Sequence, residues 1–524
     1  MAPYALVRPS IPRLPVLGAI SVVVVAVLAV LIGSGSATSS GPAAAPSAGI
    51  PAPSSGPARL VTVGGALRAR PLPAGFLGLS LEYRAINEYA GRDPAAINPL
   101  LVRLIRGLSP GQRPELRIGG DSTDRTWWPA RGISKPLGAY IKLNRNWGAV
   151  AGALVRATDA RVVLGIDLEA DSGGVAGVEA RRLIAAIGRS HVQALELGNE
   201  PELYGAFTWY HVDGRKMPGR PAGWNFADYL RQFTAVARSL PRVPLAGPAV
   251  GSVKWMRDVG RYVAAEPRVR IITLHRYPLQ RCYVPRRARV YPTIAHLFAP
   301  ASTTGLAASV AHDVKLAHAH GLTIRIDEIN TISCGRVPTV DESFASALWL
   351  LQTLFAFARA GVDGVNIHTY AGSPYALFKF HHHARAWSAV VYPEYYGMRM
   401  FAQAAPAGSR LLSIDGARHA GVLAWATSGP QHEVRVVVIN THPQAHSLDV
   451  RVQGGGVTAT VERLLGPGLH ARSGVTIGGQ SLSATKAEDT RGSARGIEHV
   501  TRQNGTYRVA VPGASAALLT VANS

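Results

Sequence analysis

Two glutamates, Glu200 and Glu328, each follow a short apolar segment with the composition of a buried β-strand. A pair of carboxyl groups facing each other is what retaining cleavage of a glycosidic bond requires. One ionised carboxylate attacks the anomeric carbon, while the other gives its proton to the leaving oxygen and later activates water. Asn199, beside Glu200, is suited to hydrogen-bond the 2-hydroxyl of the sugar. The pair therefore predicts a glycosidase centre.

Polar residues also end the other apolar segments, which predicts one polar mouth where the carboxyl ends of the strands meet. The candidate substrate-binding residues at these ends are Asp121, Asn199, His275, Tyr277, Asn330, His368 and Tyr370. For His275 and His368 we expect hydrogen-bonding roles, because no third metal ligand clusters with them. Asp327 adjoins Glu328, and since neighbours on a strand point to opposite faces, we expect only one of them to enter the mouth.

The elements that must position these residues alternate between short apolar runs and longer amphipathic ones. The expected strands are 76–82, 115–119, 162–168, 192–197, 243–247, 269–275, 323–326 and 364–368. The expected helices between and after them are 98–107, 147–157, 178–187, 226–239, 307–320, 344–360 and 393–405. The fifth crossover has the weakest helical pattern. This repeat predicts an α/β fold, a (β/α)8 TIM barrel over residues 71–405. The alternative, a doubly wound sheet, lacks a glycine-rich dinucleotide fingerprint after its first strand.

Residues 406–524 change character, with short β-branched segments separated by turn residues. This pattern predicts an antiparallel β-sandwich. Within residues 58–70, the segment Leu60–Val63 is also strand-like, and we expect it to join that sandwich. The domain either covers one face of the barrel, which we favour, or binds glycan.

The first residues point to export. Residues 1–33 combine Arg8 and Arg13 with the apolar run Val16–Ile32, which predicts a signal peptide or signal anchor. Residues 34–57 consist mainly of Pro, Ala, Ser and Gly and predict a disordered linker. We therefore expect an extracytoplasmic protein, either secreted or held at the membrane by this segment alone.

The net charge and the motifs of the chain limit the kinds of binding partner that we expect. The 524 residues carry 55 Lys and Arg against 32 Asp and Glu, a net charge of +23. The excess is scattered and accompanies no zinc-finger spacing, RNA-binding signature or phosphate loop, so nucleic acid is not expected. The excess either favours an anionic substrate, such as an acidic glycan, or reflects high arginine usage along the whole chain. No metal, nucleotide or redox cofactor is implied.

The two cysteines, Cys282 and Cys334, lie shortly after the sixth and seventh expected strands. Consecutive barrel strands are adjacent, so the two loops should meet. In an oxidising compartment we expect a disulfide rather than two free thiols.

Three segments carry a family resemblance: Arg117–Trp128, Gly198–Pro201 and Asp327–Gly335. In this order they resemble glycoside hydrolase family 79, the heparanase and β-glucuronidase family, in the clan of (β/α)8 retaining glycosidases. The resemblance implies that Glu200 is the acid/base and Glu328 the nucleophile. It further implies that Tyr277 orients the nucleophile and that Asp121 contacts the sugar.

The segment 366–375 resembles the loop that receives the uronic carboxylate in the glucuronidase branch, which implies that role for Tyr370 or Tyr375. The expected protein is an exported retaining β-glycosidase, most simply a β-glucuronidase acting on uronic-acid-containing glycans. An endo-acting hydrolase of an acidic polysaccharide and a neutral-sugar β-glycosidase are the enzyme alternatives. A surface glycan-binding protein with an inactive barrel is the non-enzyme alternative.

Overall fold

The computed structural model describes residues 58–67, 70–384, 386–419, 421–483 and 496–523. The expected signal segment (1–33) and linker (34–57) lie outside these ranges. Within the ranges, none of the helices has both the length and the apolar character that crossing a membrane requires.

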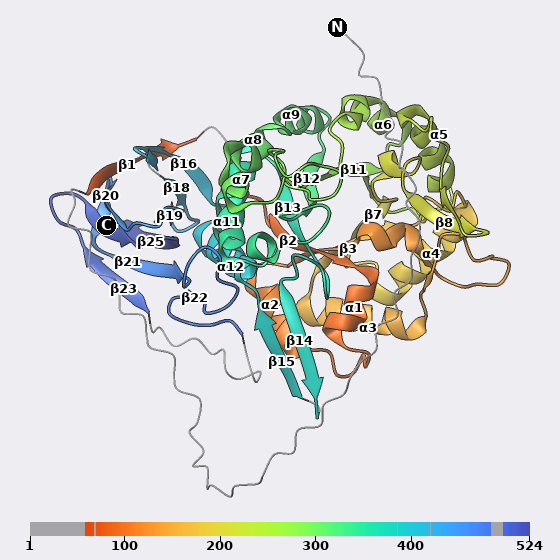
Figure 1. The fold of residues 1–524 in the computed structure, drawn as a ribbon, viewed down its shortest axis with the longest axis horizontal. Coiled ribbons are helices and arrows are strands. Elements are labelled where there is room, and N and C mark those ends of the chain that lie inside the picture. Colours follow the sequence, from red (N-terminus) through yellow and green to blue (C-terminus); the bar gives the residue numbers. More distant parts are fainter. Residues whose placement is uncertain (1–57, 68–69, 385, 420, 484–495, 524) are drawn as a thin grey trace, which may run out of the picture. The chain divides into compact units, whose positions relative to one another are not determined.

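Parallel strands close into a barrel in the order β10-β11-β12-β13-β2-β3-β6-β7 (Figure 1). Their bounds are β2 Leu77–Glu82, β3 Glu115–Gly119, β6 Arg161–Ile166, β7 Val192–Leu197, β10 Leu245–Val250, β11 Val269–Arg276, β12 Thr323–Ile329 and β13 Gly364–Thr369. These strands are apolar on both faces because helices cover the outside while side chains fill the inside. The TIM barrel predicted from the alternation is confirmed.

Helices follow the barrel strands: α1 Tyr83–Ala90, α2 Pro99–Gly107, α3 Arg145–Thr158, α4 Gly173–Ile187, α5 Phe226–Ala237, α6 Val259–Ala265, α7 Ile294–Phe298, α8 Thr304–Ala308, α9 Ala311–Ala319, α10 Pro338–Asp341, α11 Phe344–Ala360 and α12 Pro393–Ala404. The fifth crossover helix, α6, has only 7 residues, which explains its weak sequence pattern. The single helix predicted over 307–320 is instead α8 and α9. Ser309 ends α8, because its hydroxyl bonds the carbonyl of Leu306 and competes with the helical backbone.

Short paired strands extend the loops of the barrel: β4 Thr126–Trp127 with β5 Ile141–Lys142, β8 Thr208–Val212 with β9 Arg215–Pro218, and β14 Phe378–His383 with β15 Ala386–Val391. The β8–β9 hairpin belongs to the loop after β7, and β14–β15 to the loop after β13.

The C-terminal strands form one antiparallel-rich sheet in the order β22-β21-β25-β19-β18-β16-β1-β20-β24, with β17 and β23 paired to β18 and β21. Their bounds are β1 Arg59–Ala66, β16 Arg410–Asp415, β17 Arg418–His419, β18 Val422–Ser428, β19 Val434–Asn440, β20 His446–Val452, β21 Gly455–Leu465, β22 Thr476–Ile477, β23 Ile497–Thr501, β24 Tyr507–Val511 and β25 Ser515–Asn523. β1 pairs antiparallel with β16 and parallel with β20. The N-terminal strand thus lies inside the C-terminal sheet.

This sheet buries both of its faces along the middle strands. In β19, Val434, Val436 and Val438 belong to the sandwich core, while Val437 and Ile439 belong to the core shared with the barrel. The alternation follows the two-residue period of a strand. The sandwich therefore has its own core and a second apolar face against the barrel helices.

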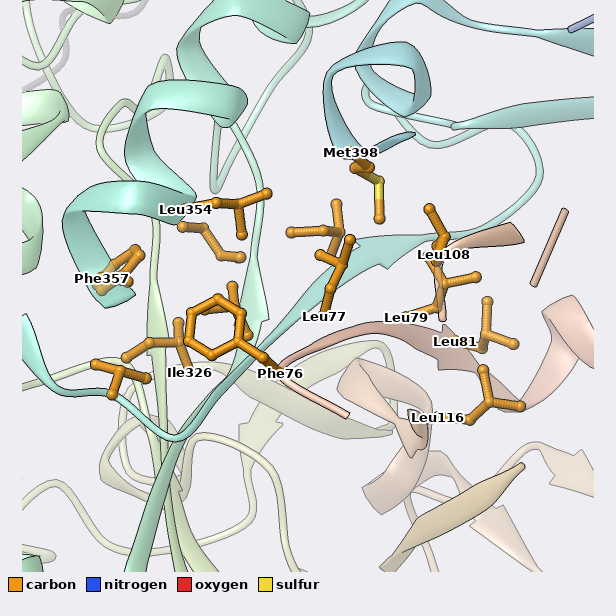
Figure 2. Packing of buried hydrophobic residues seen from close by; sticks show 14 of the residues in the cluster. Phe76, Leu77, Leu79, Leu81, Leu108, Leu116, Ile326, Leu354, Phe357 and Met398 are labelled. Carbon is orange, nitrogen blue, oxygen red and sulfur yellow. The ribbon is translucent and has the colours of Figure 1, made fainter. Parts of the chain in front are cut away.

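Helices α11 and α12 lie between the barrel strands and the C-terminal strands (Figure 1). At this junction Phe355 of α11 stacks on Trp425 of β18 with ring centroids 5.5 Å apart. On the opposite side, Leu354 and Phe357 of α11 pack toward Ile326 of β12 and Phe76 (Figure 2). Because α11 is buried all round, its sequence is apolar all round.

Candidate active site

Arg117 of β3 lies at the centre of the barrel mouth and is fully buried. Its guanidinium contacts side chains from β7, from the residues just after β7, and from β12: Glu196 Oε2 at 2.6 Å, Asn199 Oδ1 at 2.9 Å and Glu328 Oε2 at 2.6 Å. A planar guanidinium with five donors suits such divergent partners. One arginine thus joins the ends of β3, β7 and β12 into a single site.

Glu328 of β12 is held on both carboxylate oxygens. Arg117 contacts Oε2, and the hydroxyl of Tyr277 donates to Oε1 over 2.8 Å. Burial opposes ionisation, but the positive charges of His368, His275 and Arg117 and the Tyr277 hydrogen bond outweigh it. Together they hold the pKa of Glu328 well below its usual range. Glu328 is therefore an oriented carboxylate at neutral pH.

Glu200 follows β7 in a different environment. Its side chain is 24% exposed, and Oε1 lies 3.0 Å from Nδ1 of His275. Glu200 has φ +45°, a left-handed conformation that is costly for a residue with a Cβ. Its N–H donates to the carbonyl of Ala249, which is also left-handed at φ +55°. Two strained residues bonded to each other aim Glu200 toward the open mouth.

His275 of β11 links the two glutamates. Nδ1 faces Glu200, and Nε2 lies 3.3 Å from Nη2 of Arg117, which in turn holds Glu328. Burial disfavours the imidazolium, yet the negative charges of Glu328 and Asp327 and the Glu200 contact raise the pKa of His275 to about 10. The side chain is only 1% exposed, so His275 lies behind the carboxyl groups rather than on the substrate surface expected for it.

Asn199 and Asp121 lie on the β3–β7 side of the mouth. The Asn199 amide accepts from Arg117 through Oδ1 and lies 3.4 Å from Asp121 Oδ1 through Nδ2. Asp121 is exposed to solvent at the mouth. Reduced solvation in this concave setting, followed by the negative charges of Glu82, Glu200 and Glu328, raises its pKa to about 7. The charges of Glu200 and Glu328 therefore both influence the ionisation of Asp121.

His368 of β13 forms a second buried link. Its Nδ1 bonds Ser80 Oγ at 3.0 Å, and its Nε2 lies 3.3 Å from Glu82 Oε1. Glu82 in turn accepts the backbone N–H groups of Asp121 and Ser122. His368 therefore supports the loop after β3 and, like His275, takes a hydrogen-bonding position. Within the described ranges, no group of three or more His, Cys, Asp or Glu is arranged to hold a metal ion.

Aromatic residues line the β11–β13 side. Tyr375 lies 6.0 Å from Tyr277 and 6.3 Å from Tyr370 between ring centroids. Tyr370 is also covered by the guanidinium of Arg84, 4.5 Å from the ring centroid. Arg84 stands just after β2, and β2 and β13 are adjacent strands. An exposed cation thus sits beside the loop expected to receive a carboxylate.

Asn330 does not reach this mouth. It is fully buried, and its amide donates to the backbone carbonyl of His368 over 3.0 Å. It supports β13 from below, so the substrate contact expected for it is corrected. The reason is that the chain has turned away from the barrel interior by Asn330, one residue after β12 ends.

The expectation that only one of Asp327 and Glu328 faces inward is wrong. Asp327 Oδ2 lies 3.1 Å from Arg117 Nε, and Glu328 Oε2 lies 2.6 Å from Nη1. The pairing of β12 with β13 shifts register between Ile326 and Ile329, and that with β11 shifts beside His275. Such an irregularity interrupts the alternation of side chains, and both acidic groups reach Arg117.

Glu82 and Arg117 were expected only as polar residues at the strand ends, and Glu196 was not expected in the site at all. The sequence does contain a pattern that indicates these positions. Two expected strands have polar or small residues two positions apart: Ser80 and Glu82 in one, Arg117 and Gly119 in the other. In a barrel strand this spacing marks one face. A charge in the middle of such a strand requires a partner inside the barrel.

A disulfide joins Cys282 to Cys334. It ties the loop after β11, which follows Tyr277, to the loop after β12, which follows Glu328. The backbone N–H of Arg281 also donates to the carbonyl of Cys334. These bonds couple the two loops that carry the Tyr277–Glu328 contact.

The C-terminal sheet is similar to a domain of a known family. The family model for the glycosyl hydrolase family 79 C-terminal beta domain matches residues 424–518. The barrel with its C-terminal sheet and this match define the class, an O-glycosyl hydrolase. The resemblance to glycoside hydrolase family 79 is confirmed, because the matching domain is that of the family. No curated protein matches the chain significantly.

Solved structures share the fold. A 4-O-α-L-rhamnosyl-β-D-glucuronidase from Fusarium oxysporum 12S, with Rha-GlcA bound, aligns with TM-score 0.67 and 17% identity over 88% of this chain and 100% of that chain. The GH51 arabinofuranosidase from Xanthomonas axonopodis pv. citri aligns with TM-score 0.62 and 14% identity over 88% and 100%. The α-L-arabinofuranosidase from Thermotoga maritima aligns with TM-score 0.59 and 14% identity over 88% and 99%.

Proposed function

We propose that this chain is a retaining β-glycosidase of β-glucuronidase-like specificity, with Glu328 as nucleophile and Glu200 as acid/base. The observation that carries this assignment is the difference between the two carboxyl groups. Glu328 is held by Arg117 and Tyr277, whereas Glu200 is partly exposed and contacts His275 alone among the side chains described. A held carboxylate suits attack, and an accessible carboxyl suits proton exchange with a leaving group and water.

In the first step Glu328 attacks the anomeric carbon while Glu200 gives its proton to the glycosidic oxygen. In the second step Glu200 takes a proton from water, which releases the sugar from Glu328 with its anomeric configuration retained. Asn199 is placed to hydrogen-bond the 2-hydroxyl, a contact that strengthens as the oxocarbenium ion forms. Arg117 and Tyr277 keep Glu328 ionised before it attacks and stabilise the carboxylate again when water releases the sugar.

An acidic substrate is supported by charges around the mouth. Arg286, Arg287 and Arg289 are exposed on the disulfide-tied loop after β11, and none has an ion pair among the described residues. Arg84 lies beside Tyr370, where β2 and β13 end. The Fusarium oxysporum enzyme that shares this fold is a rhamnosyl-β-D-glucuronidase. We propose a β-linked uronic acid in the mouth, with Arg84, Tyr370 and Tyr375 as the carboxylate-binding group.

The test is a panel of aryl β-glycosides: glucuronide, glucoside, galactoside and xyloside. Turnover of the glucuronide with a β-anomer as first product by NMR, abolished in Glu328→Gln, supports the proposal. Glu462→Gln, in the C-terminal sheet, is the matched control and should retain full activity. An α-anomer as first product overturns retention, and preference for a neutral glycoside overturns uronate specificity. Binding of glycan without turnover by the parent protein favours a glycan-binding role.

Export rests on residues 1–33 and is proposed from the sequence. The protein should appear outside the cytoplasm, either free or with membranes. Fractionation of cells with N-terminal sequencing of the mature chain distinguishes cleavage from anchoring, and activity confined to the cytoplasm contradicts export.

A further inference from the structure

Beneath Glu328, two buried carboxyl groups compete for one N–H. Glu196 Oε2 of β7 lies 2.6 Å from Arg117 Nε, and Asp327 Oδ2 of β12 lies 3.1 Å from the same nitrogen. Both side chains are completely inaccessible to solvent. The Nε atom of arginine carries one hydrogen. It bonds Glu196, and Asp327 cannot be satisfied in the same way.

The remaining oxygens have no donor. Among the described residues, Glu196 Oε1 and both carboxyl oxygens of Asp327 accept no hydrogen bond. His275 Nε2 is 3.8 Å from Asp327 Oδ1, beyond hydrogen-bond distance. A buried carboxylate without donors is strongly disfavoured. Two ionised carboxylates also cannot donate to each other, whereas a proton on one of them provides the missing donor.

We propose that Glu196 and Asp327 share one proton, carried by Asp327, and that this pair is a positioning element for Glu328. Glu196 is the ionised member, because the shorter contact with Arg117 is its own. The pair then places one negative charge beneath Arg117 instead of two. Arg117 consequently retains positive charge for Glu328, whose role as nucleophile rests on the proposed function above.

The charged groups around the pair agree with this assignment. The charged and titratable groups around Asp327 come from four strands. They are Arg117 of β3, Glu196 of β7, His275 of β11, and Arg325 and Glu328 of β12, its own strand. Burial and then the negative charge of Glu196 raise the pKa of Asp327 well above its usual range. Burial opposes the ionisation of Glu196, but the charge of Arg117, followed by a proton shared with Asp327 and the charge of His275, lowers its pKa.

The number of negative charges that each variant leaves beside Arg117 tests the shared proton. Asp327→Asn retains Glu196 as the single negative charge, and its amide donates as the carboxylic acid did. In Glu196→Gln the amide donates to Asp327, which then ionises and becomes the single negative charge. Only the double variant removes the charge altogether. If both groups were ionised, each single variant would instead remove one of two charges.

The first measurement is infrared difference spectroscopy of the full chain without substrate. The parent-minus-variant spectrum should show the loss of one protonated carboxyl C=O band in Asp327→Asn and also in Glu196→Gln. Absence of that band in both difference spectra overturns the shared proton. This readout involves no turnover, so it stands even where the glycosidase assignment fails.

The second measurement is the pH profile of kcat/KM on the best aryl glycoside. The two single variants should lose similar amounts of kcat/KM, because each leaves one negative charge beside Arg117, and their acidic limbs should not move. The double variant should lose at least tenfold more than the product of the two single losses, mainly in kcat. A loss equal to that product overturns the positioning role. Glu462→Gln is the control, and circular dichroism of all variants verifies folding.

Discussion

The hydroxyl of Tyr277 donates to Oε1 of Glu328 over 2.8 Å, and this bond spans the ends of β11 and β12. Because Arg117 holds the other oxygen, the carboxylate has a fixed direction as well as a lowered pKa. A nucleophile that needs no rotation before attack loses less entropy in the reaction. The two contacts therefore suit Glu328 to the nucleophile role proposed for it.

Tyr277→Phe should lower kcat by about 10- to 100-fold and leave KM within about threefold, since one charge-assisted hydrogen bond contributes about 1.5–3 kcal/mol. Steady-state kinetics on an aryl β-glucuronide measures both constants. Tyr283→Phe, in the exposed part of the same loop, is the control. An unchanged kcat in Tyr277→Phe would show that Arg117 alone orients the nucleophile.

Arg117→Met should destabilise the fold by about 3–5 kcal/mol, because it leaves buried carboxylates without their cation. Denaturant unfolding gives the free energy of unfolding. Arg508→Met breaks an exposed pair with Asp449 and should leave the midpoint almost unchanged. Equal stability of Arg117→Met and the parent would mean that the carboxyl groups take up protons at little cost.

The free energy of unfolding should fall as pH rises from about 5 to about 9. Burial, and then the negative charge of Glu200, raises the pKa of Glu202 to about 8, and Glu202 Oε2 is buried without a partner among the described residues. Burial, followed by the charge of Asp124, raises the pKa of Glu169 to about 9. Between the unfolded pKa near 4.3 and these values the native state binds more protons than the unfolded state, so rising pH favours unfolding.

Thermal unfolding across this pH range measures the trend, and Glu202→Gln should flatten it between about pH 5 and 8. Glu462→Gln, in the C-terminal sheet, provides the comparison; burial raises the pKa of Glu462 too, so this variant should flatten the trend in the same direction. A melting temperature that rises steadily toward pH 9 contradicts the assignment.

Loss of the disulfide in Cys282→Ser/Cys334→Ser should cost roughly 4 kcal/mol in the chain-entropy model for a separation of 52 residues. Because the bond ties the loops after Tyr277 and Glu328, kcat should fall with stability. Unfolding and kinetics with and without reductant provide the comparison. Alkylation without reductant followed by mass spectrometry checks the bond itself, and two labelled thiols would refute it.

Arg84→Gln should reduce kcat/KM for an aryl β-glucuronide by about tenfold or more, while the value for the matching glucoside stays the same or rises. The physical reason is the loss of a cation beside Tyr370 that, in the proposed function, pairs with the uronic carboxylate. Arg508→Gln, far along the chain in the C-terminal sheet, is the charge-matched control. An equal loss on both substrates would assign Arg84 to general stability of the rim.

The sequence by itself determined the architecture and the principal carboxyl groups. Apolar strands alternating with amphipathic helices permit few folds, and residues at the carboxyl ends of barrel strands must share one mouth. Glu200, Glu328, Asn199 and Tyr277 could therefore be expected together before any coordinates. The short β-branched segments after residue 406 likewise predicted the C-terminal sandwich.

The tertiary structure alone decided which way the side chains next to these residues point. Asp327 and Glu328 both reach Arg117 because strand pairing shifts register around them, and Asn330 turns away because the strand has ended. Register depends on hydrogen bonds with β11 and β13, strands distant along the chain. Local periodicity contains no information about such pairing. The buried network of charged side chains is therefore evident only in the closed barrel.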